Sequence, residues 1–119
     1  MRYTVSMKQN KDFRRLYSSK NCCLRPNFVM YCRKNKLGQN RLGLTVGKKL
    51  GCAVVRNRIK RRLKELYRVN EHRLKTSYDI VIVARTKAKD SLYNFLLKDF
   101  NIAVSELNLL SDKIDDKND

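Results

Sequence analysis

The spacing of hydrophobic residues predicts a long helix in the middle of the chain, from Ala53 to about Asn70. Its apolar side chains recur every three or four residues, which places them on one buried face: Val55, Ile59, Leu63 and Leu66. A polar and basic set falls on the opposite face: Asn57, Lys60, Arg61, Lys64 and Arg68. Arg56 and Arg58 flank the buried stripe. We expect Arg62, near its edge, to lay its stem on apolar surface and keep its guanidinium in water.

Two further helices are predicted, one toward each end of the chain. The first covers about Gln9 to Ser18, where Phe13, Leu16 and Tyr17 share a face. The last is expected to be capped by Asp90 or Ser91. Its inward-facing side chains should be Leu92, Leu96, Phe100, Ala103 or Val104, Leu107 and Leu110.

Alternating apolar and polar residues predict two strands before the long helix. From Asn27 to Lys34 one face is expected to carry Phe28, Met30 and Cys32, and the other Val29, Tyr31 and Arg33. The segment from Arg41 to Val46 alternates in the same way. Residues 35–40 have the composition of a turn, so we expect a β-hairpin with one apolar face.

A third strand, from Tyr78 to Arg85, is an unbroken β-branched run, typical of a central strand buried on both faces. The predicted order is helix, hairpin, helix, strand, helix, which indicates a small α/β sandwich with helices over a mixed sheet. With 119 residues the chain is expected to hold one domain, residues 1–110, followed by a charged and disordered tail, residues 111–119.

Charge adds a strong functional signal, because 28 basic residues stand against 11 acidic ones and give a net charge of +17. Residues 1–64 hold 19 Lys and Arg and a single acid, whereas residues 65–119 hold 9 basic and 10 acidic residues. An excess of positive charge confined to one half of a single domain favours an anionic partner, and nucleic acid is the usual one. A solvated basic face is the plainer alternative. An anionic membrane surface is a weaker one, since no Trp- and Phe-rich amphipathic helix is present.

Other compositional features narrow the class of protein. The longest apolar stretch, residues 80–84, is too short to cross a bilayer, and residues 1–8 have no apolar core of secretory length, so we expect a cytosolic protein. Cys22, Cys23, Cys32 and Cys52 do not follow zinc-module spacing, and His72 is the single histidine. We expect free thiols that act as small buried hydrophobes, and no metal site.

The run from Leu44 to Arg61 resembles the conserved motif of the bacterial ribonuclease P protein, whose core "RNR" is Arg56-Asn57-Arg58 here. The resemblance extends over Lys8 to Leu110. It departs from the family at Gly47, where Ser is usual, and at Cys52, where Asn or Lys is common, which weakens the case for polar contacts at these two positions.

The resemblance implies an α+β fold, a two-layer αβββαβα sandwich of the ribosomal protein S5 domain 2 type with a left-handed crossover. One strand more is implied than the pattern predicts, and Asn21 to Leu24 is its best candidate. The implied function is that of the protein subunit of ribonuclease P, which assists endonucleolytic removal of the 5′ leader of precursor tRNA. Catalysis is expected from the RNA subunit, and Mg²⁺ is expected to be held mainly by that RNA and the substrate. The implied partners are the catalytic RNA and precursor tRNA, with no membrane and no obligatory protein partner.

Two sets of side chains are expected to contact RNA. Arg forks and Lys point charges suit phosphate oxygens, and the predicted RNA-binding set is Lys48, Lys49, Arg56, Asn57, Arg58, Lys60, Arg61, Lys64 and Arg68. By the resemblance, a cleft between the first helix and the sheet holds the single-stranded leader, and by position its residues are Phe13, Tyr17, Tyr31, Lys48 and Asn57. Rings beside cations bind unstacked bases at about 1–3 kcal/mol per base. The plainer alternative is that the rings are core residues.

No catalytic residue is expected in the chain itself. His72 lies in a charged stretch, and four aspartates are scattered without the paired pattern of a two-metal nuclease: Asp12, Asp79, Asp90 and Asp99. Two other functions stay open, a structural RNA-binding protein such as a ribosomal one and a nuclease with its own active site.

Overall fold

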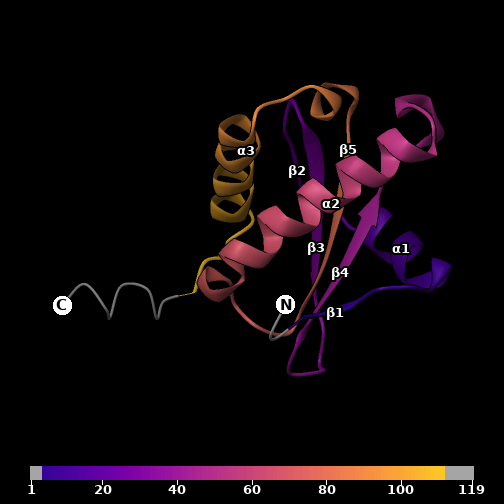
Figure 1. Cartoon of the computed structure of the whole chain (residues 1–119). Helices are drawn as coiled ribbons and strands as arrows, with labels where there is room; N and C mark the ends of the chain where they lie inside the picture. Colours follow the sequence, from indigo (N-terminus) through magenta and orange to yellow (C-terminus); the bar gives the residue numbers. More distant parts are fainter. Residues whose placement is uncertain (1–3, 112–119) are drawn as a thin grey trace.

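The structure, a computed structural model, describes residues 4–111 and holds a five-stranded sheet with three α-helices within them (Figure 1). The strands are β1 (Thr4–Ser6), β2 (Cys22–Leu24), β3 (Phe28–Lys34), β4 (Asn40–Thr45) and β5 (Tyr78–Ala84). The α-helices are α1 (Asn10–Tyr17), α2 (Ala53–Asn70) and α3 (Tyr93–Glu106). Three short 3₁₀ helices join them: η1 (Lys48–Leu50), η2 (Glu71–Arg73) and η3 (Thr86–Lys89). The predicted α+β class is confirmed.

The strand order β1-β4-β5-β3-β2 shows that the predicted hairpin was wrong. β3 and β4 do not pair with each other, because β5 lies between them, antiparallel to β3 and parallel to β4. The uninterrupted apolar run of β5 explains this order, since only a central position buries both of its faces. The central, doubly buried position predicted for this strand is confirmed.

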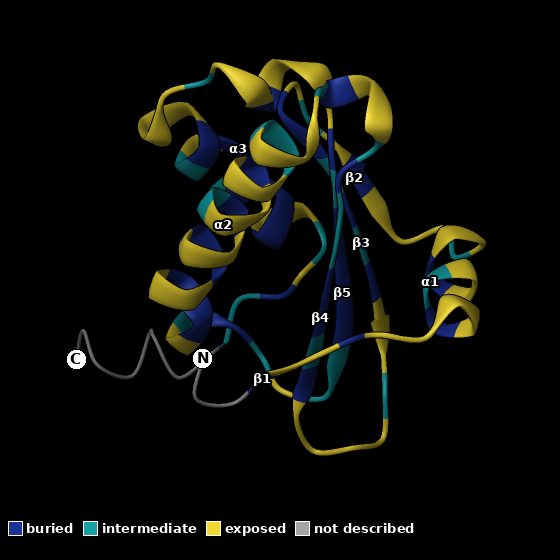
Figure 2. Cartoon of the chain, turned by 45° about the vertical axis from the view of Figure 1, so that its right-hand side comes forward, coloured by how far each residue is buried: buried dark blue, intermediate teal, exposed yellow. Residues whose placement is uncertain are grey.

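Helices cover both faces of the sheet, as Figure 2 shows. α2 and α3 lie over one face and enclose the larger core, to which β5 contributes Ile80 and Ile82. The shorter α1 lies over the other face, where Leu16 packs against Val81. The period of two along β5 therefore places successive side chains in two separate cores.

Two short strands complete the sheet. β2 forms at the predicted extra strand and pairs antiparallel with β3, with Cys23 opposite Met30. β1 was not predicted, because three residues are too few to show a period. It pairs parallel with β4 as far as the partners Ser6 and Leu42, so β4 has no neighbouring strand on that side beyond Leu42.

The start of α3 differs from the prediction. The residue before its first turn is Leu92, which makes no side-chain cap and is 65% exposed, so neither Asp90 nor Ser91 caps the helix. Arg62 of α2 donates to the carbonyls of Ala88 and Ser91 and holds the connecting segment against α2 until α3 begins. Of the predicted tail only Ser111 lies within the described residues, and residues 112–119 lie outside them.

Candidate nucleic-acid interface

The exposed face of α2 is a basic surface, as its sequence pattern predicts. Ile59, Leu63 and Leu66 are buried in the larger core, which fixes how the helix is turned. All five polar residues predicted for the opposite face are exposed: Asn57, Lys60, Arg61, Lys64 and Arg68. The helix therefore directs a row of cations to solvent.

Three cations of α2 already have partners within the chain. Arg56 is half-buried, and its Nε donates to the carbonyl of Gly51 at 3.2 Å. Arg68 forms an ion pair with Glu65, and both side chains are 53% exposed, so the pair contributes little stability. Arg62 bonds to backbone carbonyls instead of keeping its guanidinium in water, which corrects the prediction for it.

η1 brings two more cations to the start of α2. Lys48 and Lys49 are exposed, whereas Leu50 is buried and anchors the segment in the core. Gly51 then adopts a φ of +142°, which favours glycine, and a Cβ there would come within 3.0 Å of Val55. This turn connects η1 to α2, so the lysines lie next to the first turn of the helix.

Cys52 directly precedes α2 and is exposed, unlike the buried thiol that the sequence suggested. The backbone N–H groups of Val55 and Val54, in the first turn of α2, lower the pKa of the Cys52 thiol. Among the other three free cysteines, Cys23 and Cys32 are buried as expected, and Cys22 is exposed.

The aromatic residues predicted for the leader cleft form one cluster between α1 and the sheet. The ring centroids of Tyr17 and Tyr31 are 5.3 Å apart with the rings edge to face, and those of Phe13 and Tyr17 are 6.3 Å apart. The Tyr17 hydroxyl lies 2.7 Å from the Thr45 hydroxyl of β4. Phe13 and Tyr31 are half-buried against the smaller core, while Tyr17 is 40% exposed. The cluster is therefore part core and part surface.

Gly43 of β4 allows the Phe13 ring to lie directly on the sheet. A Cβ at this position would come within 2.6 Å of Phe13 Cε1 and Cζ, closer than side-chain carbons approach. Because the Phe13 ring occupies the space next to Gly43, the position of α1 depends on the absence of a side chain at residue 43.

Ion pairs through Arg41 hold the first turn of α1 on the sheet. Arg41 of β4 binds Asp79 with two hydrogen bonds, of 2.8 and 2.7 Å, and reaches Asp12 of α1 at 3.2 Å. Burial disfavours the charged form of Asp79, but the bonds from Arg41 and Asn35 outweigh burial and lower the pKa of Asp79. Arg41 thus connects α1 to β4 and β5 through one guanidinium.

A groove opens beside these aromatic rings, between α1, the uncovered edge of β4 and α2. Its volume is about 540 Å³, and its lining includes no carboxylate. The lining residues are Asn10, Phe13, Arg14, Tyr17, Leu44, Thr45, Val46 and Lys60. We call this hollow the aromatic groove. Of the five residues predicted for the leader cleft, Phe13 and Tyr17 line it, Tyr31 supports Tyr17 from behind, and Lys48 and Asn57 do not line it.

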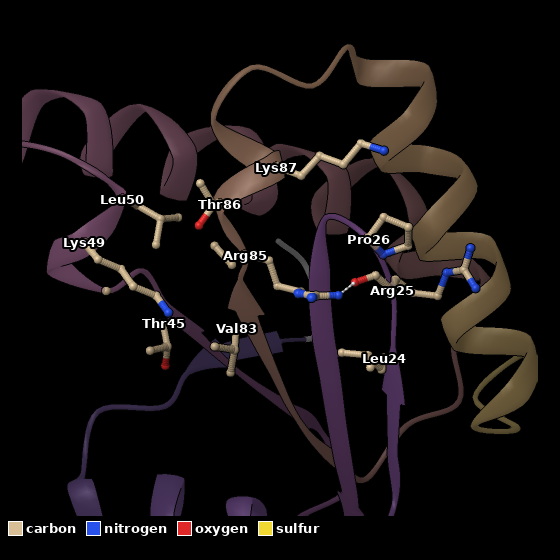
Figure 3. A pocket seen from close by; sticks show the side chains of 12 residues that line it. Leu24, Arg25, Pro26, Thr45, Lys49, Leu50, Val83, Arg85, Thr86 and Lys87 are labelled. Atoms are coloured by element: carbon tan, nitrogen blue, oxygen red, sulfur yellow. Dashed lines mark hydrogen bonds between the residues drawn. The ribbon is translucent and has the colours of Figure 1, made fainter.

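A second hollow, of about 830 Å³, lies between η1, η3 and the turn that joins β2 to β3 (Figure 3). It shares Thr45 with the aromatic groove, and Lys49, Arg85 and Lys87 project around it. Arg85 donates to the carbonyl of Arg25 at 2.8 Å. Sequence reasoning missed Arg85 and Lys87, because the half of the chain that contains them has no excess positive charge. The signal that could have found them is their position directly after the predicted central strand, where side chains gather at the end of the sheet.

Neither a metal cluster nor a membrane span is found in the part of the chain that the structure describes. No three His, Cys, Asp or Glu residues among residues 4–111 form a set that could hold a metal ion. No helix within the same residues is long and apolar enough to cross a membrane.

Comparison with known proteins identifies the family. The model of the Ribonuclease P family matches residues 1–108. A ribonuclease P protein component from Alkaliphilus metalliredigens is 44% identical over 93 residues, which cover 78% of this chain and 84% of that protein. The chain belongs to the bacterial ribonuclease P protein family. The ribonuclease P protein component of Clostridioides difficile is 37% identical over 105 residues, covering 87% of this chain and 89% of that protein.

Solved structures of ribonuclease P proteins share the fold. The Staphylococcus aureus protein gives a TM-score of 0.79 at 33% identity and covers 89% of this chain and 97% of its own. The Thermotoga maritima protein gives 0.73 at 26% identity, covering 82% and 92%. The ribonuclease P protein is a subunit of the ribonuclease P holoenzyme, an endoribonuclease that acts on tRNA precursors, and its function is RNA binding in tRNA 5′ processing. Family identity implies the RNA of ribonuclease P and precursor tRNA as partners.

Proposed function

We propose that the chain uses two surfaces in this reaction, one for each RNA partner. The exposed face of α2, together with η1, binds the catalytic RNA. The aromatic groove binds the single-stranded leader of precursor tRNA. Bond cleavage takes place on the catalytic RNA in the cytoplasm, and Mg²⁺ is held mainly by that RNA and the substrate.

The observation that carries this proposal is the chemistry of the aromatic groove. Rings from α1 lie at its wall, Lys60 of α2 lies at its other side, and no carboxylate lines it. Tyr17 is open enough, at 40% exposure, to stack on a base, and Lys60 is placed to neutralise a phosphate. Stacking surfaces beside cations bind single strands with little sequence preference, which suits leaders of varied sequence.

The surface of α2 has a different chemistry, which favours a structured partner. It offers exposed Arg and Lys side chains on a rigid helix and no exposed ring among the predicted contacts. A rigid row of cations matches the regular phosphate spacing of folded RNA. Arg58, Arg61 and Lys64 are its strongest candidates, because Arg56 and Arg68 also bond within the chain.

Three of the aspartates within residues 4–111, Asp12, Asp79 and Asp99, favour a structural role over a catalytic one. Asp12 and Asp79 share Arg41. Asp99 is buried and accepts hydrogen bonds from Arg25, from the backbone N–H of Asn27 and from the Asn27 amide. A carboxylate held in such a network is not positioned to bind a metal ion together with a second carboxylate.

Incubation with precursor tRNA tests the proposal against both alternatives. We expect no cleavage by the purified chain alone, and cleavage at low Mg²⁺ by the catalytic RNA only when the chain is present. Cleavage by the chain alone would indicate a nuclease with its own active site. No effect on the RNA-catalysed reaction would indicate a structural RNA-binding protein.

A further inference from the structure

Another hollow, which is distinct from the two described above and is bordered by cations, lies between the start of α1 and the turn that joins β3 to β4. Its volume is about 640 Å³. Besides Arg41, six cations border it: Lys8, Lys11 and Arg15 on the α1 side and Arg33, Lys34 and Lys36 on the strand and turn. We call this surface the turn cleft. All six are exposed, and within residues 4–111 none of their side chains forms an ion pair or a hydrogen bond with another side chain.

The acids in the turn cleft do not neutralise these cations. Its lining contains two carboxylates, Asp12 and Asp79, and both are bound to Arg41. Asp12, Asp79 and Arg41 together carry a net charge of −1, whereas the six exposed cations carry +6. The turn cleft therefore attracts a polyanion, and in an RNA-processing subunit a phosphodiester chain has the required charge.

The turn cleft is linked to the aromatic groove through a third hollow. A small hollow of about 230 Å³ lies between them and shares Ser6 and Met7 with the turn cleft. The same hollow shares Leu44 and Lys60 with the aromatic groove. A strand that lies in the aromatic groove can thus reach the turn cleft by passing Ser6 and Met7, close to the start of α1.

The direction of the strand follows from where this path meets the surface proposed for the catalytic RNA. Lys49, Lys60 and Lys64 belong to that surface and border the other hollows of the path, whereas none of the residues that line the turn cleft belongs to it. The leader should be closest to its cleavage site near these three lysines. The turn cleft lies beyond them, where the distal part of a long leader would arrive.

We propose that the turn cleft binds the phosphodiester backbone of the distal part of the 5′ leader. The inference rests on the proposed binding of the leader in the aromatic groove, and it adds a separate site with a separate chemistry. No aromatic side chain lines the turn cleft. It therefore binds phosphates rather than stacking bases, and adds affinity for long leaders whatever their sequence.

The test is a triple charge variant in the reconstituted holoenzyme, Lys11→Ala/Arg15→Ala/Lys34→Ala. The matched control, Lys20→Ala/Lys89→Ala/Lys98→Ala, removes the same charge from exposed positions that line neither the turn cleft nor the aromatic groove. Dissociation constants are measured for precursor tRNA with leaders of about 4 and about 16 nucleotides, for mature tRNA, and for the catalytic RNA alone.

We expect the triple variant to bind the long-leader substrate about 10-fold more weakly than the control variant does at moderate salt. The slope of log affinity against log salt should also become shallower by about 2, because three phosphate contacts to a single strand are lost. Binding of the short-leader substrate, mature tRNA and the catalytic RNA should match the control.

Three results would overturn the inference. The first is an affinity for the long-leader substrate equal to that of the control variant. The second is an equal loss of affinity for both leader lengths. The third is a loss of affinity for the catalytic RNA alone that accounts for the weaker binding of the substrate. Binding of the short-leader substrate tests the aromatic groove separately, because a short leader is not expected to reach the turn cleft. If Tyr17→Ala leaves short-leader binding intact, the proposed leader groove fails; if only the long-leader effect is missing, the turn cleft alone fails.

Discussion

The contact between Gly43 and Phe13 gives the sharpest test of how α1 is held. In Gly43→Ala the new methyl group would lie 2.6 Å from Phe13 Cε1 and Cζ and 3.2 Å from Val81 Cγ2. Ordinary carbon contacts need about 3.5–4.0 Å, so the Phe13 ring has to move by about 1 Å or more. Val81 is fully buried and cannot yield as far, so α1 has to shift.

This displacement should lower both stability and leader affinity. Overpacking of a well-packed core typically costs about 1–3 kcal/mol, and we expect the free energy of unfolding to fall by that amount. A displaced Phe13 changes the ring contact with Tyr17 and the wall of the aromatic groove. Affinity for leader-bearing precursor tRNA should therefore fall by up to about 1–3 kcal/mol, the value of one base stack.

Urea unfolding and equilibrium binding by the holoenzyme measure the two effects, and two further variants separate their causes. Gly47→Ala is the matched control, because a Cβ there meets no atom within 4 Å, and its stability should be unchanged or slightly higher. In Gly43→Ala/Phe13→Leu the smaller side chain relieves the contact, so stability should recover while leader binding stays weak. Wild-type stability and leader affinity in Gly43→Ala would refute the deduced packing of α1.

Three further predictions concern the RNA surfaces. Affinity for the catalytic RNA should fall with salt with a log–log slope of about −4 to −6 for about six phosphate contacts, and a slope near zero would contradict an electrostatic interface. Arg61→Ala or Lys64→Ala should weaken that binding with little change in thermal stability, whereas Ile59→Ala should cost about 2–5 kcal/mol of unfolding free energy, and the reverse pattern would mean that α2 faces the other way. Tyr17→Ala should weaken binding of leader-bearing precursor tRNA by about 1–3 kcal/mol and leave mature tRNA and saturated cleavage unchanged, and equal losses for both RNAs in a folded variant would exclude the leader groove.

Elements with a long, regular pattern could be predicted from the sequence. The bounds predicted for α2 are those observed, because an apolar repeat over 18 residues determines both the helix and its buried face. The central position of β5 followed from its unbroken apolar run. Alternation in β3 and β4 located both strands but could not say which strands pair, because pairing depends on contacts between distant segments.

The basic face of α2 could be predicted for a related reason, since all its residues lie on one helix. The aromatic groove could be predicted only in part. Tyr17 and Thr45 are 28 positions apart in sequence yet share a hydrogen bond, and Lys60 reaches the same groove from a different layer. Nor could the sequence reveal that Arg56 and Arg62 bond to backbone carbonyls, because such bonds depend on where the chain turns.

The order of strands also explains why the two RNA surfaces meet. β5 separates β3 from β4 and so leaves β4 close to one edge of the sheet, with only the three residues of β1 outside it. Past Leu42 that edge is open, with α1 on one side and α2 on the other. Lys60 lies on the exposed face of α2 and also lines the aromatic groove. A phosphate of either RNA that binds Lys60 changes the charge that the other RNA meets. Binding of leader and of catalytic RNA should therefore be coupled through this residue, and in Lys60→Ala the coupling should weaken more than it does in Arg61→Ala.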